Sequence, residues 1–105
     1  MDVVAMSPDE CVGLLGRDSV GRVAFVTPAG PRLIPVTYVS DDSSVTFRTT
    51  AYSELATYAP ETEVSFEIDH LDRDHRRGWS VVAHGTCERV EDEAQRRRAL
   101  DPAEL

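Results

Sequence analysis

The chain lacks lysine altogether, because all eleven of its basic residues are arginines. Without a lysine amine, Schiff-base catalysis and the phosphate-binding lysine of a P-loop are both excluded. Any anion site must therefore use arginine, hydroxyl groups or backbone N–H groups. Bases are also few overall, since 19 acids against 11 bases give a formal charge of −8. We therefore expect no nonspecific attraction to nucleic acid or to an anionic membrane surface.

Long apolar runs and metal-binding cysteine patterns are absent as well. No apolar run approaches the roughly 18 residues that span a bilayer, and residues 1–5 lack the basic start of a secretion signal. We therefore expect a cytoplasmic protein that does not enter a membrane. Its two cysteines, Cys11 and Cys87, fit no metal or redox spacing and are expected to be reduced thiols.

Capping and turn residues predict where helices and strands begin and end. The run Ser7-Pro8-Asp9-Glu10 joins a capping serine, a proline at the first helical position and a reciprocal glutamate, which predicts a helix over 8–15. A shorter helix is expected over 53–58, because the residue before Pro60 avoids the helical conformation. Strands are expected over 20–27, 32–39, 45–49, 63–69 and 78–90, with turns at 28–31 and 40–43 and a charged loop at 71–77.

The order of these elements predicts the fold class. Short antiparallel strands joined by hairpins, with small helices between them, are typical of a compact β-barrel or a half-open sheet rather than a parallel fold. At 105 residues the chain is expected to be a single domain over 1–105. Residues 1–16 would hold the N-terminal helix, 20–90 the barrel strands and 91–105 a polar helix and tail.

Two of the expected strands carry informative patterns. In the strand over 63–69, Val64, Phe66 and Ile68 alternate with mostly acidic residues, so these three side chains should share the buried face. In the strand over 32–39, Pro35 has no N–H to donate to a ladder. That strand should therefore be an edge strand or carry a bulge.

Histidines and serines offer weaker candidate sites. His70 and His75 lie near several aspartates, but their spacing matches no zinc pattern, so a solvated turn is the preferred interpretation. His84, alone on a strand, is expected to be a half-buried packing residue. Ser65 and Ser80 lie on strands without the glycine-flanked turn of a nucleophilic serine, which argues against a hydrolase. No residue is identified as a catalytic group or a metal ligand.

The strongest local signal lies where the third expected strand ends. Arg48 supplies charge, while Thr49 and Ser53 supply hydroxyl donors, and this combination suits a phosphate group. The alternative is that Ser53 only caps its helix and Arg48 only decorates a strand end. Glu54 opposes a bound anion unless its side chain turns outward on the first helical turn, where an acid suits the helix dipole.

From about Gly21 to Gly85 the chain resembles the pyridoxamine 5'-phosphate oxidase-like family, the flavin-binding split β-barrels. The resemblance rests on the segments GRVAFVTPAGPRLIPVTY, VTFRTTAYSELA and GWSVVAHGT, which occur in the family's order and at its spacing. It implies a mainly β fold with short α-helices, arranged as an antiparallel split β-barrel. It also implies a homodimeric flavoprotein that holds FMN between two barrels and acts as an oxidoreductase, with the protein supplying orientation and electrostatics.

The resemblance further assigns residues to the FMN site. The strand from Arg32 to Thr37 would line the flavin ring with its backbone groups, and Ser80 would approach the ring. Arg48 and Thr49 resemble the strand end near the ribityl phosphate, and Ser53 resembles its hydroxyl donor. The cofactor-binding positions expected in this way are Arg32, Leu33, Ile34, Pro35, Val36, Thr37, Arg48, Thr49, Ser53, Glu54, Trp79 and Ser80.

Two departures from the family pattern affect these expectations. Many relatives have a basic residue after the serine, whereas this chain has Glu54, which is expected to weaken FMN binding. Relatives also continue into a further strand beyond the last expected helix, so the barrel is expected to lack its final strand. Pyridoxamine 5'-phosphate is not expected as the substrate, because its own phosphate lacks an evident basic partner. The alternatives are a deazaflavin or haem in the same barrel, or a dimeric interaction protein without a cofactor.

Overall fold

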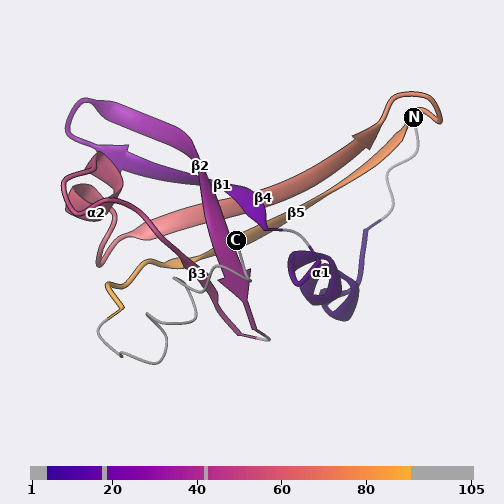
Figure 1. Ribbon diagram of the computed structural model, residues 1–105, viewed down its shortest axis with the longest axis horizontal. Helices are drawn as coiled ribbons and strands as arrows, with labels where there is room; N and C mark the ends of the chain where they lie inside the picture. The colour runs from indigo at the N-terminus through magenta and orange to yellow at the C-terminus, as the bar shows by residue number, and fades with distance from the viewer. Residues whose placement is uncertain (1–4, 18, 42, 91–105) are drawn as a thin grey trace.

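The computed structural model of the chain describes residues 5–17, 19–41 and 43–90. The five strands in this part form one antiparallel sheet in the order β3-β2-β1-β4-β5, accompanied by two short helices (Figure 1). The mainly β composition that the sequence predicts is therefore confirmed. The elements are α1 (Pro8–Leu15), β1 (Val20–Thr27), β2 (Gly30–Ser40), β3 (Val45–Phe47), α2 (Glu54–Tyr58), β4 (Glu63–Asp72) and β5 (Arg77–Thr86).

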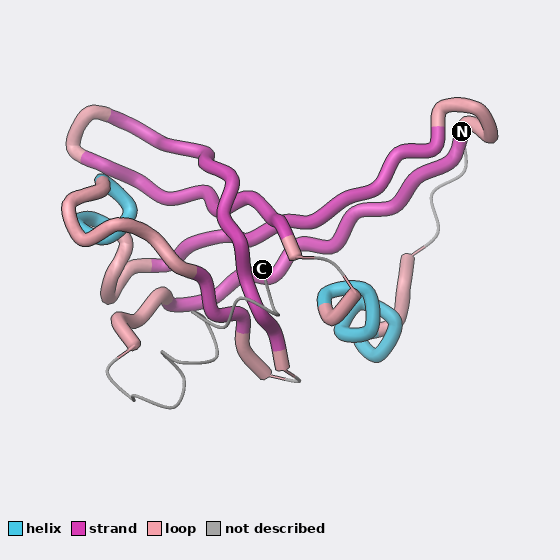
Figure 2. Tube along the Cα trace, viewed as in Figure 1, coloured by secondary structure: helices cyan, strands magenta, loops and turns pink. Residues whose placement is uncertain are grey.

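The sheet bends strongly and is not closed within the described residues. Its two edges are β3 and β5, and no pairing between described residues joins them. Figure 1 shows β4 and β5 running side by side as one long hairpin, which the β1–β2 hairpin crosses. Figure 2 shows the helices at opposite ends of the molecule, with α2 beside the β1–β2 turn at the left and α1 at the lower right, below the β4–β5 hairpin.

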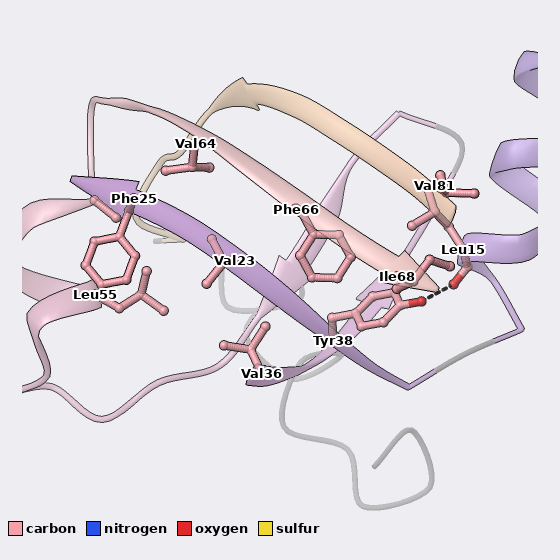
Figure 3. Close-up of a cluster of buried hydrophobic side chains, with 11 residues drawn as sticks. Leu15, Val23, Phe25, Val36, Tyr38, Leu55, Val64, Phe66, Ile68 and Val81 are labelled. Carbon is pink, nitrogen blue, oxygen red and sulfur yellow. Dashed lines mark hydrogen bonds between the residues drawn. The ribbon is translucent and has the colours of Figure 1, made fainter. Parts of the chain in front are cut away.

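Local capping fixes α1 at the predicted boundaries. The Ser7 hydroxyl oxygen accepts a hydrogen bond from the Glu10 N–H at 3.2 Å, and the Glu10 carboxylate accepts one from the Ser7 N–H in return. Leu15 is the buried residue of this helix, and its carbonyl accepts a hydrogen bond of 2.7 Å from the Tyr38 hydroxyl (Figure 3). The helix is thereby attached to β2, 23 residues further along the chain.

The strand register gives the sheet a buried inner face and an exposed outer face. Val23 lies opposite Ile34 on β2 and opposite Phe66 on β4, so these three residues share the inner face. Arg22 lies opposite Pro35 and, being one residue earlier in β1, points to the outer face.

The core fills the inner face and is covered at one end by α2. Phe66 is central to it, because its ring packs edge-on against Tyr38 with centroids 4.7 Å apart. Val64, Phe66 and Ile68 are all buried, which confirms the predicted inner face of the 63–69 strand. The buried hydrophobic residues are Leu15, Val23, Phe25, Val36, Tyr38, Leu55, Ala59, Val64, Phe66, Ile68 and Val81 (Figure 3).

Several predicted boundaries are wrong. β3 ends at Phe47 rather than at residue 49, so Arg48 and Thr49 lie beyond the ladder. The predicted loop over 71–77 shrinks to 73–76, because β4 continues to Asp72 and β5 begins at Arg77. Charged residues suggested a loop there, but the hairpin continues to pair beyond the core, where backbone hydrogen bonds are made whatever the side chains are.

At the other end of the hairpin, β5 stops at Thr86 rather than at residue 90. The chain then keeps two backbone hydrogen bonds to the loop before β4, from the Cys87 N–H to the Thr62 carbonyl at 2.8 Å and from the Glu61 N–H to the Cys87 carbonyl at 2.7 Å. The polar helix and tail expected over 91–105 lie outside the described residues. Neither of the described helices is long and apolar enough to cross a membrane.

Candidate functional site

One side of β2 has no strand partner over residues 32–37. β1 pairs with β2 from Gly30 to Thr37, whereas β3 pairs with it only from Tyr38 to Ser40. No strand among the described residues covers the other side of 32–37, and we call this side the open edge. A strand edge presents N–H and C=O groups that need partners, so it can bind a ligand with complementary groups.

The register decides which backbone groups face the open edge. The Tyr38 N–H donates to the Ser19 carbonyl at 3.1 Å, so the even-numbered residues of β2 direct their backbone groups toward β1. Leu33, Pro35 and Thr37 consequently direct theirs toward the open edge. Pro35 therefore removes no hydrogen bond from the β1–β2 ladder. β2 as a whole lies between β1 and β3 and has no bulge, so the predicted edge is present only locally, along the stretch that contains Pro35.

At one end of the open edge, the start of α2 meets β2. The Arg32 Nε atom lies 3.2 Å from the Glu54 Oε1 atom, which forms an ion pair between residues 22 positions apart. The Thr49 and Ser53 hydroxyl oxygens lie 2.7 Å apart, and the Ser53 hydroxyl also accepts a hydrogen bond from the Ala56 N–H at 3.1 Å. The structure thus brings four of the predicted site residues together, and we call Arg32, Thr49, Ser53 and Glu54 the α2 corner.

Burial of Leu55 explains why the α2 corner forms. The Leu55 side chain is only 1% exposed and lies beside Phe25 in the core (Figure 3). Phe25 in turn lies opposite Arg32 in the β1–β2 register. Because Glu54 immediately precedes Leu55, anchoring Leu55 in the core brings the Glu54 carboxylate to Arg32.

The Arg32–Glu54 ion pair lies at the surface, so another anion can replace the Glu54 carboxylate beside Arg32. The side chains of Arg32 and Glu54 remain 36% and 52% exposed. Pairs of this kind contribute about 0.2–1 kcal/mol to stability, so a competing anion could take the place of the carboxylate. The sequence favoured a Glu54 side chain turned away from the phosphate corner, whereas in the structure Ser53 caps the helix and Glu54 neutralises Arg32, the first residue of the strand expected to line the flavin ring.

Arg48 lies beside the α2 corner and borders a pocket. The pocket has a volume of about 310 Å³ and is lined by Thr49, Leu55 and Pro60 among others. Arg89 also lines it and donates a hydrogen bond of 3.4 Å to the Ala56 carbonyl. None of the ion pairs between described residues uses Arg48, so its charge is the one most available to an anion near this corner.

The sheet separates the remaining predicted residues. Val36 is a core residue on the inner face, and Ile34 packs against the core beside it. Trp79 lies on the same inner face as the buried Val81, two residues further along β5, whereas Ser80 points outward. Two strands lie between β2 and β5, which at about 4.8 Å per strand places Ser80 roughly 14 Å from β2. Within one chain, Ser80 does not join the open edge.

A charged cluster on the outer face was missed by the sequence reasoning. Arg22 Nη1 lies 3.1 Å from Glu67 Oε1 and 3.1 Å from Asp69 Oδ2. Partial burial and the neighbouring Asp69 carboxyl raise the pKa of Glu67 above its usual value. Two features of the sequence could have predicted this cluster. Acidic residues alternate with the buried residues of the 63–69 strand, and the first strand carries Arg22 at the position that pairs with Glu67.

The role expected for His84 is wrong. Its side chain is 61% exposed rather than half-buried, and its Nδ1 atom lies 3.1 Å from the Ser65 hydroxyl oxygen. Its Nε2 atom lies 3.6 Å from Glu63 Oε2, which gives a serine–histidine–acid line. Ser65 pairs with strands on both sides, and its side chain contacts the residue directly opposite on β5, so the line is an ordinary cross-strand contact on the exposed face of the sheet.

Metal and redox sites are not evident in the described part of the chain. No group of three or more metal-ligating side chains there could hold a metal ion. His75 Nδ1 contacts Asp72 Oδ2 at 2.8 Å within the β4–β5 turn. Cys11 and Cys87 are free thiols, as predicted, and burial raises the pKa of the Cys87 thiol.

Comparison with known families and sequences gives a consistent result. The model of a family described as pyridoxamine 5'-phosphate oxidase matches residues 7–104. An uncharacterized protein of Mycobacterium tuberculosis is 33% identical over 99 residues, and the match covers 90% of this chain. The chain spans 65% of the length of that relative.

Solved structures share the fold. A structure described as the FAD binding protein from Mycobacterium smegmatis is 31% identical with a TM-score of 0.82, over 95% of this chain and 82% of that one. A putative pyridoxamine 5'-phosphate oxidase from Corynebacterium glutamicum is 25% identical with a TM-score of 0.74, over 96% of this chain and 75% of that one. These similarities confirm the split-barrel fold class that the sequence predicted.

Proposed function

The chain belongs to the pyridoxamine 5'-phosphate oxidase family, and we propose that it binds a flavin along the open edge of β2 and acts as a flavin-dependent oxidoreductase. The observation that carries this proposal is the open edge itself. Among the described residues, no strand pairs with the backbone groups of Leu33, Pro35 and Thr37 on this side, and they lie beside a corner that holds an arginine and two hydroxyls. A flavin ring has a polar edge of donors and acceptors that such backbone groups can bind.

The residues present fit a flavin ring better than they fit its phosphate. Leu33 and Thr37 each direct an N–H toward the open edge, and Pro35 directs a carbonyl there. At the phosphate end, Arg48 is the available cation, because Arg32 is paired with Glu54. The flavin supplies hydride or electron transfer when bound, while the chain binds and orients it.

FMN is the flavin that the family resemblance implies, and FAD is the second candidate. The observation that supports FAD is the similarity to the structure from Mycobacterium smegmatis, which is described as an FAD binding protein. The neutralised arginine of the α2 corner also reduces the attraction for a terminal phosphate. We assign no substrate and no electron donor.

Homodimer formation is part of the proposal. The outer face exposes large apolar side chains, with Val26, Leu33 and Val82 each more than 60% exposed. A second copy that covers this face could also bring its own Ser80 toward the open edge, which one chain alone does not do. Light scattering at micromolar concentration should give twice the 11.6 kDa of one chain. A monomer at that concentration would contradict both the dimer and an interfacial flavin site.

Flavin binding is tested by absorbance and by titration. The purified chain, alone or after incubation with FMN or FAD, should absorb in the visible, and the bound flavin should be bleached by dithionite and recover in air. A sample that stays colourless with both flavins would refute the proposal and favour a cofactor-free interaction protein. Bound flavin that cannot be reduced would refute the oxidoreductase role alone.

Placement at the open edge is tested by changing one backbone donor. Thr37→Pro removes an N–H that faces the open edge, without removing a β1–β2 hydrogen bond. The matched control Thr37→Val removes the hydroxyl but keeps the N–H. Flavin affinity should fall by about 0.5–1.5 kcal/mol in Thr37→Pro and stay nearly constant in Thr37→Val, with thermal melting to verify the fold of both. Equal affinities would place the flavin elsewhere.

A further inference from the structure

In the α2 corner, the Glu54 carboxylate is the counterion of the Arg32 guanidinium. Arg32 contributes one positive charge and Glu54 one negative charge, and their side-chain atoms lie 3.2 Å apart. Thr49 and Ser53 add neutral hydroxyls that already contact each other, and the Ser53 hydroxyl also caps α2. The corner therefore has donor groups suited to an anion but no net positive charge of its own.

Different flavins would meet this corner differently. A phosphomonoester carries between about −1.5 and −2 charges at pH 7, so it must compete with the Glu54 carboxylate for Arg32 or lie close to that carboxylate. Riboflavin ends in an uncharged hydroxyl and meets no such opposition. The ring contacts along the open edge are the same for both molecules, so the difference between them isolates the effect of the corner.

We infer that Glu54 is a specificity-determining residue that discriminates against a flavin with a terminal phosphomonoester, because it holds Arg32 as an internal ion pair in the α2 corner. This inference rests on the proposed flavin site. Glu54 is a residue of the site's periphery and takes no part in electron transfer. Its side chain is 52% exposed, so it can be changed without opening the core.

The test compares riboflavin with FMN on the wild-type chain and on Glu54→Gln. Glutamine keeps the length of the side chain, and Ser53 still caps the helix while Leu55 still anchors it. Titrations that follow flavin fluorescence give both dissociation constants. The ratio of the riboflavin constant to the FMN constant should rise at least fivefold in Glu54→Gln, because FMN binding tightens while riboflavin binding does not change.

Asp74→Asn is the matched control. It removes one negative charge from the exposed β4–β5 turn, which lies at the opposite end of the sheet from α2 (Figure 1). The ratio should stay within twofold of the wild-type value there. The reciprocal variant Arg32→Gln should lower the ratio, because the uncompensated carboxylate of Glu54 then repels the phosphate.

The outcomes separate this inference from the function on which it rests. A rise below fivefold in Glu54→Gln, or an equal rise in Asp74→Asn, would overturn the selectivity role and leave flavin binding in place. Failure of both flavins to bind to the wild type and to every variant would overturn the proposed function, and the selectivity role with it.

Discussion

The β4–β5 hairpin and the open edge of β2 belong to one sheet but differ in how their backbone groups are used. β4 and β5 pair without interruption over ten residue pairs, from Glu63 with Thr86 to Asp72 with Arg77. β2 has a second strand partner over only three pairs, which begin after Thr37. The two hairpin strands pair with each other along their whole length, and the far side of β5 is an outer edge of the sheet. The open edge instead lies on an inner strand beside the α2 corner, and the described strands do not cover it. Ligand binding is therefore expected at the open edge, where unpaired backbone groups and a charged corner meet.

The β4–β5 hairpin and the open edge also differ in how their charged side chains are paired. In the β4–β5 turn, Asp72 and His75 form a contact between residues three positions apart. In the α2 corner, Arg32 and Glu54 come from different elements and meet only because the core anchors α2. The Asp72–His75 contact stabilises only its own turn. The Arg32–Glu54 pair joins two elements beside the open edge, so an anionic ligand can take the place of the carboxylate there. The predictions below test this difference, in order of decreasing effect.

The largest effect is expected from Phe66→Ala, which removes a ring that both regions share. Phe66 is 3% exposed and contacts Tyr38 of β2 from its position in β4. Loss of a buried phenylalanine should lower the free energy of unfolding by about 3–5 kcal/mol, measured by chemical denaturation. Val82→Ala, on the exposed outer face of β5, should change it little. A loss below 1 kcal/mol in Phe66→Ala would mean that the two regions do not share this core.

The fold could be predicted where local patterns decide it. The serine, proline and glutamate at 7, 8 and 10 determined α1, and the alternation of Val64, Phe66 and Ile68 identified the inner face of β4. Pro35 marked a stretch that is unpaired on one side, although β2 as a whole is an inner strand, because a missing N–H has the same consequence in any fold. The extension of β4 and β5 beyond the core was missed, since those residues pair through the backbone and carry polar or exposed side chains.

The sequence predicted which residues belong to the candidate site, but not how those residues contact one another. Arg32, Thr49, Ser53 and Glu54 were all named from the sequence, and the structure brings them together. The ion pair between Arg32 and Glu54 was not predicted, because no local pattern links residues 22 positions apart. The separation of Ser80 from the open edge was missed for the same reason, since it depends on the order of strands across the sheet.

Arg48→Ala should weaken FMN binding by about 1.5–3 kcal/mol, the range for a hydrogen bond to a charged group. Arg48 is exposed beyond the end of β3, so the fold should not change. The matched control is Arg73→Ala, which removes the same charge from the exposed β4–β5 turn and should leave FMN affinity constant. If both variants bind FMN as the wild type does, the phosphate lies away from Arg48. If both lose affinity equally, only net charge matters.

Glu54→Lys should tighten FMN binding at least tenfold, or about 1.4 kcal/mol. The change releases Arg32 from its partner and adds a second cation to the α2 corner. Because the corner is partly exposed, raising the salt concentration should reduce the gain. Asp74→Lys makes the same change of charge in the β4–β5 turn and should give a much smaller gain. Unchanged or weaker FMN binding in Glu54→Lys would refute the assignment of the phosphate to this corner.

The smallest effect is expected in the β4–β5 turn, where Asp72 and His75 are in contact. The side-chain and backbone hydrogen bonds from His75 lower the pKa of Asp72 below its ordinary value. For a carboxyl group with a lowered folded-state pKa, the stabilising contribution is present above the unfolded-state pKa and is lost as pH falls through the folded-state value. The protection of the turn amides against hydrogen exchange, relative to the intrinsic rate at each pH, should therefore decrease only on the acid side of pH 4, roughly the unfolded-state value.

His75→Ala should raise the carboxyl titration midpoint of Asp72 toward its ordinary value, as followed by NMR. Asp72→Asn should remove the acid-side change in exchange at the turn. Both variants should bind FMN like the wild type at pH 7, because the turn and the α2 corner lie at opposite ends of the sheet (Figure 1). A change in FMN affinity in either variant would show that the hairpin turn and the open edge are coupled, and the division between the hairpin and the binding region would then fail.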